Sequence, residues 1–207
     1  MTTQSGPSGS PGQTLAATLT GGIALLERAM AYTLGSLQLV TPEVMAAPTP
    51  CSAWTLRALL LHMNDSLQTL HEAIACGHID LEAHPAADYG DPVADPVGTL
   101  RTRACRMIGA WATDRGPTHI TIVDSGMPAG LVAATGAVEV AVHGWDVARA
   151  CGTTRPIPPT LAAELLPFVQ LIVDDTDRPH RFAAPEDVRP TATASDHLLA
   201  YLGRHPD

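Results

Sequence analysis

Lysine is absent from this chain of 207 residues, and its twelve basic side chains are all arginines. Together with the many alanines, prolines and glycines, this absence is typical of a GC-rich coding sequence and carries no information about mechanism. Aromatic residues are also scarce, at 4% of the chain against 45% hydrophobic residues in total, so Ala, Leu, Val and Ile have to build the core. That composition favours closely packed helices over a sheet, in one domain of ordinary size.

The chain contains no run of 18 apolar residues, which argues against a membrane span, and its N-terminus lacks the basic-then-apolar layout of a signal peptide. Its formal net charge of −9 argues against nucleic acid as a partner, because phosphates require a basic face. The four cysteines form no Cys-x-x-Cys pair and are expected to be reduced, mostly buried thiols. We therefore expect a cytoplasmic protein, monomeric or homodimeric, whose partner is a small-molecule substrate rather than nucleic acid or a membrane.

Apolar residues recur at helical spacing along most of the chain. Ser52 is a good N-cap for the second helix, and Thr193 with Asp196 forms a capping box for the last one. We expect helices at about 19–37, 52–76, 96–111, 131–150, 159–174 and 194–202, one short strand at 119–123 and a turn at 126–130. Residues 1–12 are expected to be a disordered tail, 13–155 a four-helix bundle, and 156–207 a C-terminal helical extension packed on the bundle.

The segment Glu139-Val140-Ala141-Val142-His143-Gly144-Trp145-Asp146 carries the strongest chemical signal in the sequence. On a helix, Glu139 and His143 stand one above the other on the same face, and both are good ligands for a cation such as zinc. A third candidate ligand, His62, lies in the apolar run of the second helix, so two facing helices could hold one metal ion. Two nitrogens, one carboxylate and an open position are typical of a catalytic metal site. Zinc is the first expectation, and nickel, iron(II) or manganese(II) also suit these ligands.

Neighbouring residues on the same predicted helix admit more than one interpretation. Gly136 costs about 1 kcal/mol of helix stability relative to Ala, which makes sense where another backbone or a ligand must come close. Asp146 either orients a ligand, receives a proton or is an ordinary charge, and Trp145 is expected to pack rather than to contact substrate. Arg149 is a candidate for binding an anionic substrate. A purely structural role also stays open for Glu139, because it could form a solvent-exposed side-chain pair with His143, one helical turn away.

Three segments resemble motifs of a known superfamily. The segment from Thr49 to His62, Thr-Pro-Cys-Ser-Ala-Trp-Thr-Leu-Arg-Ala-Leu-Leu-Leu-His, resembles the Pro-Cys-x-x-Trp-x-(Val/Leu)-Arg-x-Leu-x-x-His motif of the DinB/YfiT-like superfamily. Residues 139–148 are similar to the Glu-x-x-x-His-Gly-Trp-Asp-x-Ala block of its actinobacterial branch, which is related to mycothiol-dependent maleylpyruvate isomerase. Residues 196–204 resemble the closing Leu-Leu-Ala-x-x-Gly-Arg element of short members, which lack the C-terminal domain of the full-length isomerase.

The resemblance implies an all-α, DinB-like four-helix bundle whose metal ligands are His62, Glu139 and His143. It implies a metal-dependent enzyme of the mycothiol-dependent isomerase or S-transferase type, in which a metal-bound thiolate adds to an electrophilic small molecule. Asp146 is then the candidate catalytic residue, and mycothiol is the candidate co-substrate. Two alternatives stay open: a metal-assisted hydrolase or cyclase that acts on a specialised metabolite without a thiol, and a non-catalytic module that binds a metal or a small ligand.

Overall fold

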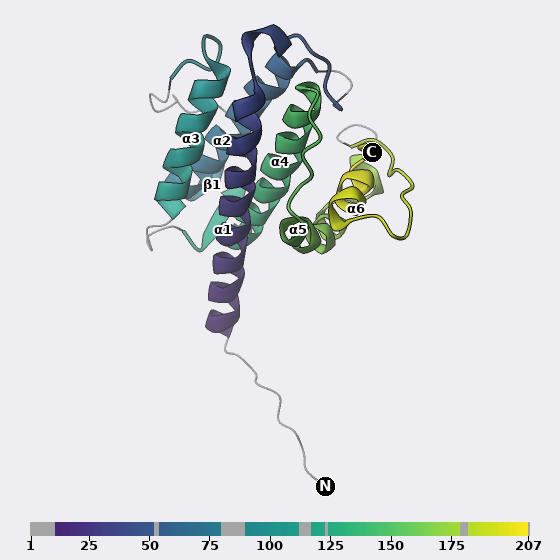
Figure 1. Cartoon of the computed structure of the whole chain (residues 1–207). Coiled ribbons are helices and arrows are strands. Elements are labelled where there is room, and N and C mark those ends of the chain that lie inside the picture. The colour runs from purple at the N-terminus through teal and green to yellow at the C-terminus, as the bar shows by residue number, and fades with distance from the viewer. Residues whose placement is uncertain are drawn as a thin grey trace.

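The computed structural model describes residues 11–51, 54–79, 90–111, 117–122, 124–178 and 182–206 of the chain. Within these ranges, four long helices lie side by side, and two further helices lie beside them next to α4 (Figure 1). The helices are α1 (Pro11–Ser36), α2 (Leu56–Cys76), α3 (Pro96–Trp111), α4 (Ala129–Ala150), α5 (Pro159–Ile172) and α6 (Ala194–Tyr201). Short 3-10 helices cover Leu37–Leu39, Pro42–Val44 and Asp175–Asp177. The predicted all-α, DinB-like four-helix bundle with a C-terminal helical extension is confirmed.

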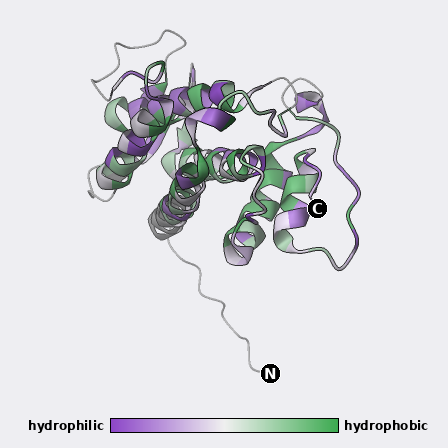
Figure 2. Cartoon of the chain, turned by 45° about the horizontal axis from the view of Figure 1, so that its top comes forward, coloured by the Kyte–Doolittle hydropathy of each residue, from purple (hydrophilic) through white to green (hydrophobic). Residues whose placement is uncertain are grey.

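The helix α4 lies at the centre of the packing and contacts α1, α2 and α5. Nearly all of its residues are buried, including the polar His143 and Asp146. A helix that is buried on every side has to be apolar on every side, and α4 consists mostly of Ala, Val and Gly. Hydrophobic residues gather where the helices face one another (Figure 2). Across the described ranges, no helix is long and apolar enough to span a membrane.

The helices α1 and α4 approach closely because glycines stand at their contact. A Cβ on Gly144 would overlap Oγ1 of Thr33 in α1, and a Cβ on Gly22 would overlap the carbonyl oxygen of Gly130. The Thr33 hydroxyl donates a hydrogen bond of 2.7 Å to the carbonyl oxygen of Val140. This contact fixes α1 against the stretch of α4 that carries the candidate ligands.

The helix α2 begins later than the expected start at residue 52. Thr55 is its N-cap, and its hydroxyl oxygen accepts a hydrogen bond of 3.3 Å from the Ala58 N–H. The chain turns just before this cap, where the Trp54 N–H donates to the carbonyl oxygen of Cys51 at 2.8 Å. Ser52, the N-cap expected from the sequence, lies outside the described residues.

A small sheet of three strands lies beside the helices, with β1 parallel to β2 and β2 antiparallel to β3. The strands are β1 (His78–Ile79), β2 (His119–Ile122) and β3 (Ser125–Pro128). The strand predicted at 119–123 is confirmed over its first four residues, and residue 123 lies outside the described residues. The turn predicted at 126–130 is wrong, because Gly126 and Met127 pair with β2 and residues 129 and 130 already belong to α4. Pairing with β2 overrides the local glycine and proline signal for a turn.

The C-terminal helices attach to the bundle through α5, which packs against α4 and α1, while α6 packs against α5. Arg28 of α1 forms an ion pair of 2.6 Å with Glu164 of α5, and the Tyr32 hydroxyl donates to the carbonyl oxygen of Arg155 at 2.6 Å. The division of the chain near residue 155 stays a prediction. The disorder expected at residues 1–12 stays a prediction for 1–10, which lie outside the described residues, and is wrong for Pro11 and Gly12, because α1 begins at Pro11 and not near the expected residue 19.

The cysteines are free thiols, as expected, but none of the four is buried. Cys51 and Cys151 are half-buried, and Cys76 and Cys105 are exposed, so the expectation of mostly buried thiols is wrong. Cys76 is the last residue of α2, where the helix leaves the core. Leu, Val, Ala and Ile fill the interior instead, and no cysteine is among the buried core residues of the described ranges.

Candidate metal centre

His62 of α2 faces Glu139 and His143 of α4 across the contact between the two helices. The Nε2 atom of His62 lies 2.6 Å from Oε1 of Glu139, and the Nε2 atom of His143 lies 3.2 Å from the same oxygen. The two imidazole rings lie edge to face, with their centroids 5.2 Å apart. Two nitrogens and one carboxylate oxygen thus lie within 4.8 Å of one another, close enough to bind one cation. The structure brings together the three residues predicted as ligands, and metal ligation itself stays a prediction.

The centre is accessible from the side of α2. The side chains of His62 and Glu139 are 37% and 35% exposed, whereas that of His143 is 8% exposed. The ring of Trp54 covers part of His62, with a centroid distance of 4.5 Å and a tilt of 49°. A small molecule can therefore reach the centre at His62 and Glu139, while His143 is fixed on the buried side.

Glu139 is held as a carboxylate. Burial alone would raise the pKa of its carboxyl, but the hydrogen bonds and charges of His143 and His62 outweigh burial and hold that pKa well below its ordinary value. The Ser66 hydroxyl donates a further hydrogen bond of 3.2 Å to Oε1. Glu139 is deprotonated, and one of its oxygens contacts both imidazoles. A cation bound between these three groups would replace the imidazole protons that face this oxygen.

His143 is fixed through its second ring nitrogen. Its Nδ1 lies 2.9 Å from Oδ2 of Asp146, and the side chain of Asp146 is fully buried. Burial alone would lower the pKa of His143, but hydrogen bonds with Asp146, Cys51 and Glu139 outweigh burial and raise that pKa well above 6.5. With Nδ1 donating to Asp146, the ring turns Nε2 toward Glu139, which is the orientation that a ligand to a metal requires.

Asp146 also contacts Arg204, which lies after α6 near the C-terminus. The guanidinium Nη2 of Arg204 donates to Oδ2 of Asp146 at 3.0 Å. Burial alone would raise the pKa of Asp146, but the hydrogen bond from His143 and the charge of Arg204 outweigh burial and lower it. Asp146 is therefore a buried carboxylate held between His143 and Arg204.

A second group of donors lies next to the first and consists of Cys51, His143 and Asp146. The Sγ atom of Cys51 lies 3.4 Å from Oδ2 of Asp146 and 3.2 Å from Nη2 of Arg204. The positive guanidinium already occupies the space beside both the thiol and the carboxylate, so it repels a second cation there. The group formed by His62, Glu139 and His143 is consequently the better metal candidate.

Residues 26–148 match the family described as the mycothiol maleylpyruvate isomerase N-terminal domain. The chain belongs to this family. The matched range is more than half of the chain and includes His62, Glu139, His143 and Asp146, whereas Arg204 lies beyond it. The recognition predicted from the sequence motifs is confirmed, and it relates the chain to an enzyme, mycothiol-dependent maleylpyruvate isomerase, and suggests a small-molecule substrate.

The relatives of this family member include an uncharacterized protein of Mycobacterium tuberculosis strain CDC 1551, 27% identical over 171 residues. That alignment covers 80% of this chain and 87% of the relative. An uncharacterized protein of strain H37Rv gives the same identity and coverage. No solved structure matches the chain. The mycobacterial relatives agree with the actinobacterial branch that the motifs resemble.

Four further residues surround the centre of this family member and were not assigned from the sequence: Cys51, Trp54, Ser66 and Arg204. Two of them stand in the Pro-Cys-x-x-Trp block that precedes α2, so the motif contained the signal. Ser66 follows His62 by four residues, and helical spacing places both on one face of α2. Arg204 ends the closing Gly-Arg element, but nothing in its local sequence indicates that it reaches α4.

Gly136, Trp145 and Arg149, the other residues of α4 considered from the sequence, pack against other side chains of the protein. A Cβ on Gly136 would come within 2.7 Å of Cδ1 of Leu70, so this glycine makes room for α2 rather than for a ligand. Trp145 is 4% exposed, in agreement with its expected packing role. The guanidinium of Arg149 lies over the Trp145 ring, 5.6 Å from its centroid.

Proposed function

We propose that this protein is a metal-dependent enzyme of the mycothiol-dependent isomerase or S-transferase type that acts on an electrophilic small molecule. The observation that carries the proposal is the approach of His62 Nε2 and His143 Nε2 to one oxygen of Glu139, at 2.6 and 3.2 Å. Membership of the mycothiol maleylpyruvate isomerase N-terminal domain family supports the thiol.

The chemistry of the donor set fits a divalent cation, with zinc as the first candidate. His62, Glu139 and His143 would hold it through two nitrogens and one oxygen, which leaves a position open in a four-coordinate site. The exposed sides of His62 and Glu139 give a co-substrate access to that position. When bound, the cation supplies Lewis acidity and favours the thiolate form of a thiol co-substrate.

The protein's own contribution is to orient the ligands. Asp146 accepts the Nδ1–H of His143 and so keeps Nε2 turned toward the site, and Arg204 keeps Asp146 in place. Of the roles predicted for Asp146, its complete burial favours orientation, because a side chain without exposed surface cannot contact a substrate. The ring of Trp54 packs against that of His62, with the two centroids 4.5 Å apart, and so restricts its movement. We therefore assign Asp146 as a positioning residue.

The decisive experiment measures thiol binding to the metal-loaded protein. A ligand that binds only the folded state stabilises it by about 2.7 kcal/mol at 100 times its Kd. Mycothiol should accordingly raise the Tm of the zinc-loaded protein and leave that of His62→Ala unchanged. In a cobalt-substituted sample, mycothiol should also produce a sulfur-to-cobalt charge-transfer band.

The matched control is S-methyl mycothiol, which has the same sugar and acyl groups but cannot form a thiolate. It should produce no charge-transfer band. If the metal binds but mycothiol shifts neither signal, the thiol role is wrong and metal-assisted hydrolysis or cyclisation becomes the better proposal. If no metal binds at all, the metal-dependent enzyme itself is wrong.

A further inference from the structure

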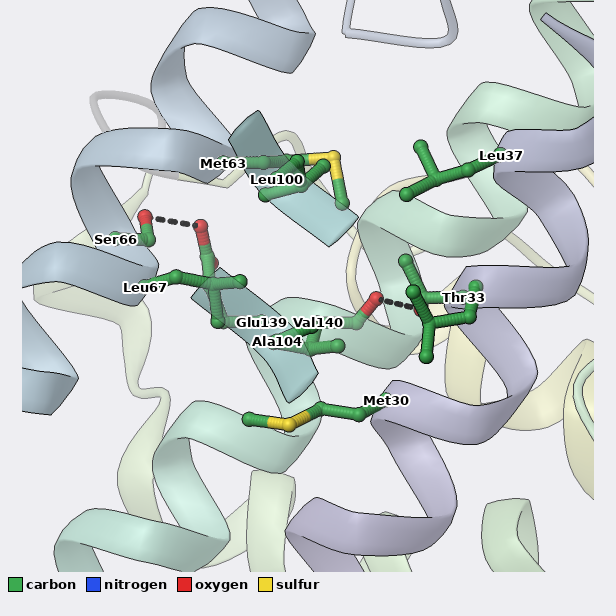
Figure 3. Close-up of a pocket in the computed structure, with 11 residues that line it drawn as sticks. Met30, Thr33, Leu37, Met63, Ser66, Leu67, Leu100, Ala104, Glu139 and Val140 are labelled. Carbon is green, nitrogen blue, oxygen red and sulfur yellow. Dashed lines mark hydrogen bonds between the residues drawn. The ribbon is translucent and has the colours of Figure 1, made fainter. Parts of the chain in front are cut away.

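The two candidate ligands of α4 are held by different polar groups. The Ser66 hydroxyl, from α2, donates to Oε1 of Glu139 at 3.2 Å (Figure 3). His143 is held instead by Asp146, whose Oδ2 lies 2.9 Å from the Nδ1 atom of the imidazole. The orientation of His143 therefore depends on the groups that hold the carboxylate of Asp146.

The thiol of Cys51 is one of those groups, together with the guanidinium of Arg204. Its Sγ lies 3.4 Å from Oδ2 of Asp146 and 3.2 Å from Nη2 of Arg204, and that Nη2 lies 3.0 Å from the same oxygen. The S–H donates to the carboxylate while the sulfur accepts from the guanidinium, so the thiol stands between opposite charges. Three donors thus converge on Oδ2 of Asp146, and the thiol is one of them.

The main chain of Cys51 is held as well. Its carbonyl oxygen accepts hydrogen bonds from the Trp54 N–H at 2.8 Å and from the Thr49 hydroxyl at 3.1 Å. The centroid of the Trp54 ring lies 4.5 Å from that of His62 and 6.2 Å from that of His143. Cys51 therefore contacts the residue that orients one histidine with its thiol, and the residue that packs against the other histidine with its carbonyl group.

We infer that Cys51 is a positioning residue of the candidate metal centre, whose thiol holds the carboxylate of Asp146 and, through it, the ring of His143. The inference rests on the proposed function, because it assumes that a metal ion binds at this centre. It adds that Cys51 acts through Asp146 and is not itself a ligand. The guanidinium of Arg204 lies beside the sulfur and would repel a cation bound to it.

Three substitutions separate the hydrogen bonds of the thiol from its volume. Cys51→Ala removes both, Cys51→Val removes the hydrogen bonds alone, and Cys51→Ser keeps a donor and an acceptor on a shorter bond. Zinc affinity, measured by titration, should fall by about 10- to 100-fold in the Ala and Val proteins, as it does when an orienting partner of a ligand is lost. The loss in the Ser protein should be smaller.

Cys151→Ala is the matched control. Cys151 is also a half-buried free cysteine, and it lies at the end of α4, outside the donor groups of the described residues. Its replacement should leave the zinc affinity unchanged.

A second measurement, on the metal-free protein, shows whether the thiol acts on His143. Nitrogen NMR of the labelled full chain follows the ring nitrogens of the histidines. Cys51→Val should shift the ring signals of His143 and leave those of His71, further along α2, unchanged. A merely structural role would lower the free energy of unfolding without this selective shift.

Cobalt substitution tests whether Cys51 is itself a ligand. Without mycothiol, the cobalt-loaded protein should show no sulfur-to-cobalt charge-transfer band. A band that disappears in Cys51→Ser would show that Cys51 binds the metal, and it would overturn the inference.

The affinities of the variants can overturn the inference too. If Cys51→Val binds zinc as tightly as the unchanged protein, the volume of the side chain matters and its hydrogen bonds do not. If Cys51→Ser loses as much affinity as Cys51→Val, restoring a donor and an acceptor has no effect and the inference is equally wrong. Should Cys51→Val fail to fold, Cys51→Ala takes its place in both measurements.

The readouts separate this inference from the proposed function. Loss of zinc affinity in Cys51→Val without any response of the unchanged protein to mycothiol would uphold the role of Cys51 and reject the thiol chemistry. If the unchanged protein binds no metal, the proposed function fails. The NMR comparison then decides by itself whether the thiol holds His143: selectively shifted ring signals uphold this contact, and unshifted signals reject it.

Discussion

The guanidinium of Arg204 lies 3.0 Å from Oδ2 of Asp146, and it connects the end of the chain with the centre of the bundle. Asp146 is fully buried and Arg204 is 9% exposed, so the pair is screened from solvent. The same oxygen of Asp146 lies 2.9 Å from Nδ1 of His143. A residue outside the matched family range therefore fixes a carboxylate that orients a candidate metal ligand.

Replacing Arg204 by Ala should destabilise the protein and weaken metal binding. Loss of one partner of a buried ion pair typically costs about 3–5 kcal/mol, because the remaining charge is left unpaired. Loss of a group that orients a metal ligand costs about 10- to 100-fold in affinity. Urea unfolding and metal titration measure the two effects, and Arg204→Lys should retain part of both. Arg189→Ala, at an exposed position of the same segment, is the control and should change neither quantity.

The pH dependence of stability should differ between the metal-free and the zinc-loaded protein. In the metal-free protein, the pKa of His143 is raised well above 6.5, so its contribution to stability is complete below pH 6.5 and is lost as the pH rises through the folded pKa. The free energy of unfolding should therefore fall above pH 6.5, by up to about 1.4 kcal/mol per pH unit for one proton. In the loaded protein the imidazoles must be neutral, so stability is lost on the acid side.

Urea unfolding at several pH values, with zinc and with a chelator, tests this difference. We expect a negative slope against pH without zinc and a zero or positive slope with zinc, over the range from 6.5 to about 8. A negative slope in both forms would mean that His143 keeps its proton when zinc is present, which contradicts its role as a ligand.

Metal analysis of the purified protein should give close to one divalent ion per chain. Ala substitution at His62, Glu139 or His143 should each lower the affinity by more than about tenfold, since even the loss of an orienting group has an effect of that size. His71→Ala is the matched control, because His71 lies on α2 nine residues after His62 and outside the donor groups of the described residues. Full occupancy in His143→Ala would reject the assigned ligands.

The sequence predicts well what depends on local spacing. Glu139 and His143 are one helical turn apart, so their shared face follows from the chain itself. The ends of α3 and the capping box of α6 at Thr193 and Asp196 also follow from local residues, and the structure has both. His62 could be placed on a helix, but its approach to α4 depends on how the helices pack.

The sequence predicts poorly what depends on distant contacts. Arg204 is separated from Asp146 by 58 positions, and no local pattern indicates that a guanidinium after the last helix reaches a buried carboxylate. The strand β3 was missed because its Gly126 and Pro128 favour a turn unless β2 lies beside them. Gly136 was interpreted as room for a backbone or a ligand, and only the packed structure identifies Leu70 as its neighbour.

The contact between α1 and α4 gives a prediction that is independent of any metal. At Gly144, a Cβ would overlap Oγ1 of Thr33 and disturb its hydrogen bond to Val140, so Gly144→Ala should destabilise the protein by about 1–3 kcal/mol as overpacking does elsewhere. At Gly21, an exposed position of α1, a Cβ would meet nothing within 4 Å. Because Ala is the better helix former, Gly21→Ala should instead raise the free energy of unfolding by up to about 1 kcal/mol. Both variants add the same methyl group to a glycine of a helix. Urea unfolding should show a lower free energy of unfolding for Gly144→Ala and a higher one for Gly21→Ala. A stabilising Gly144→Ala would show that α1 and α4 do not approach as closely as the structure places them.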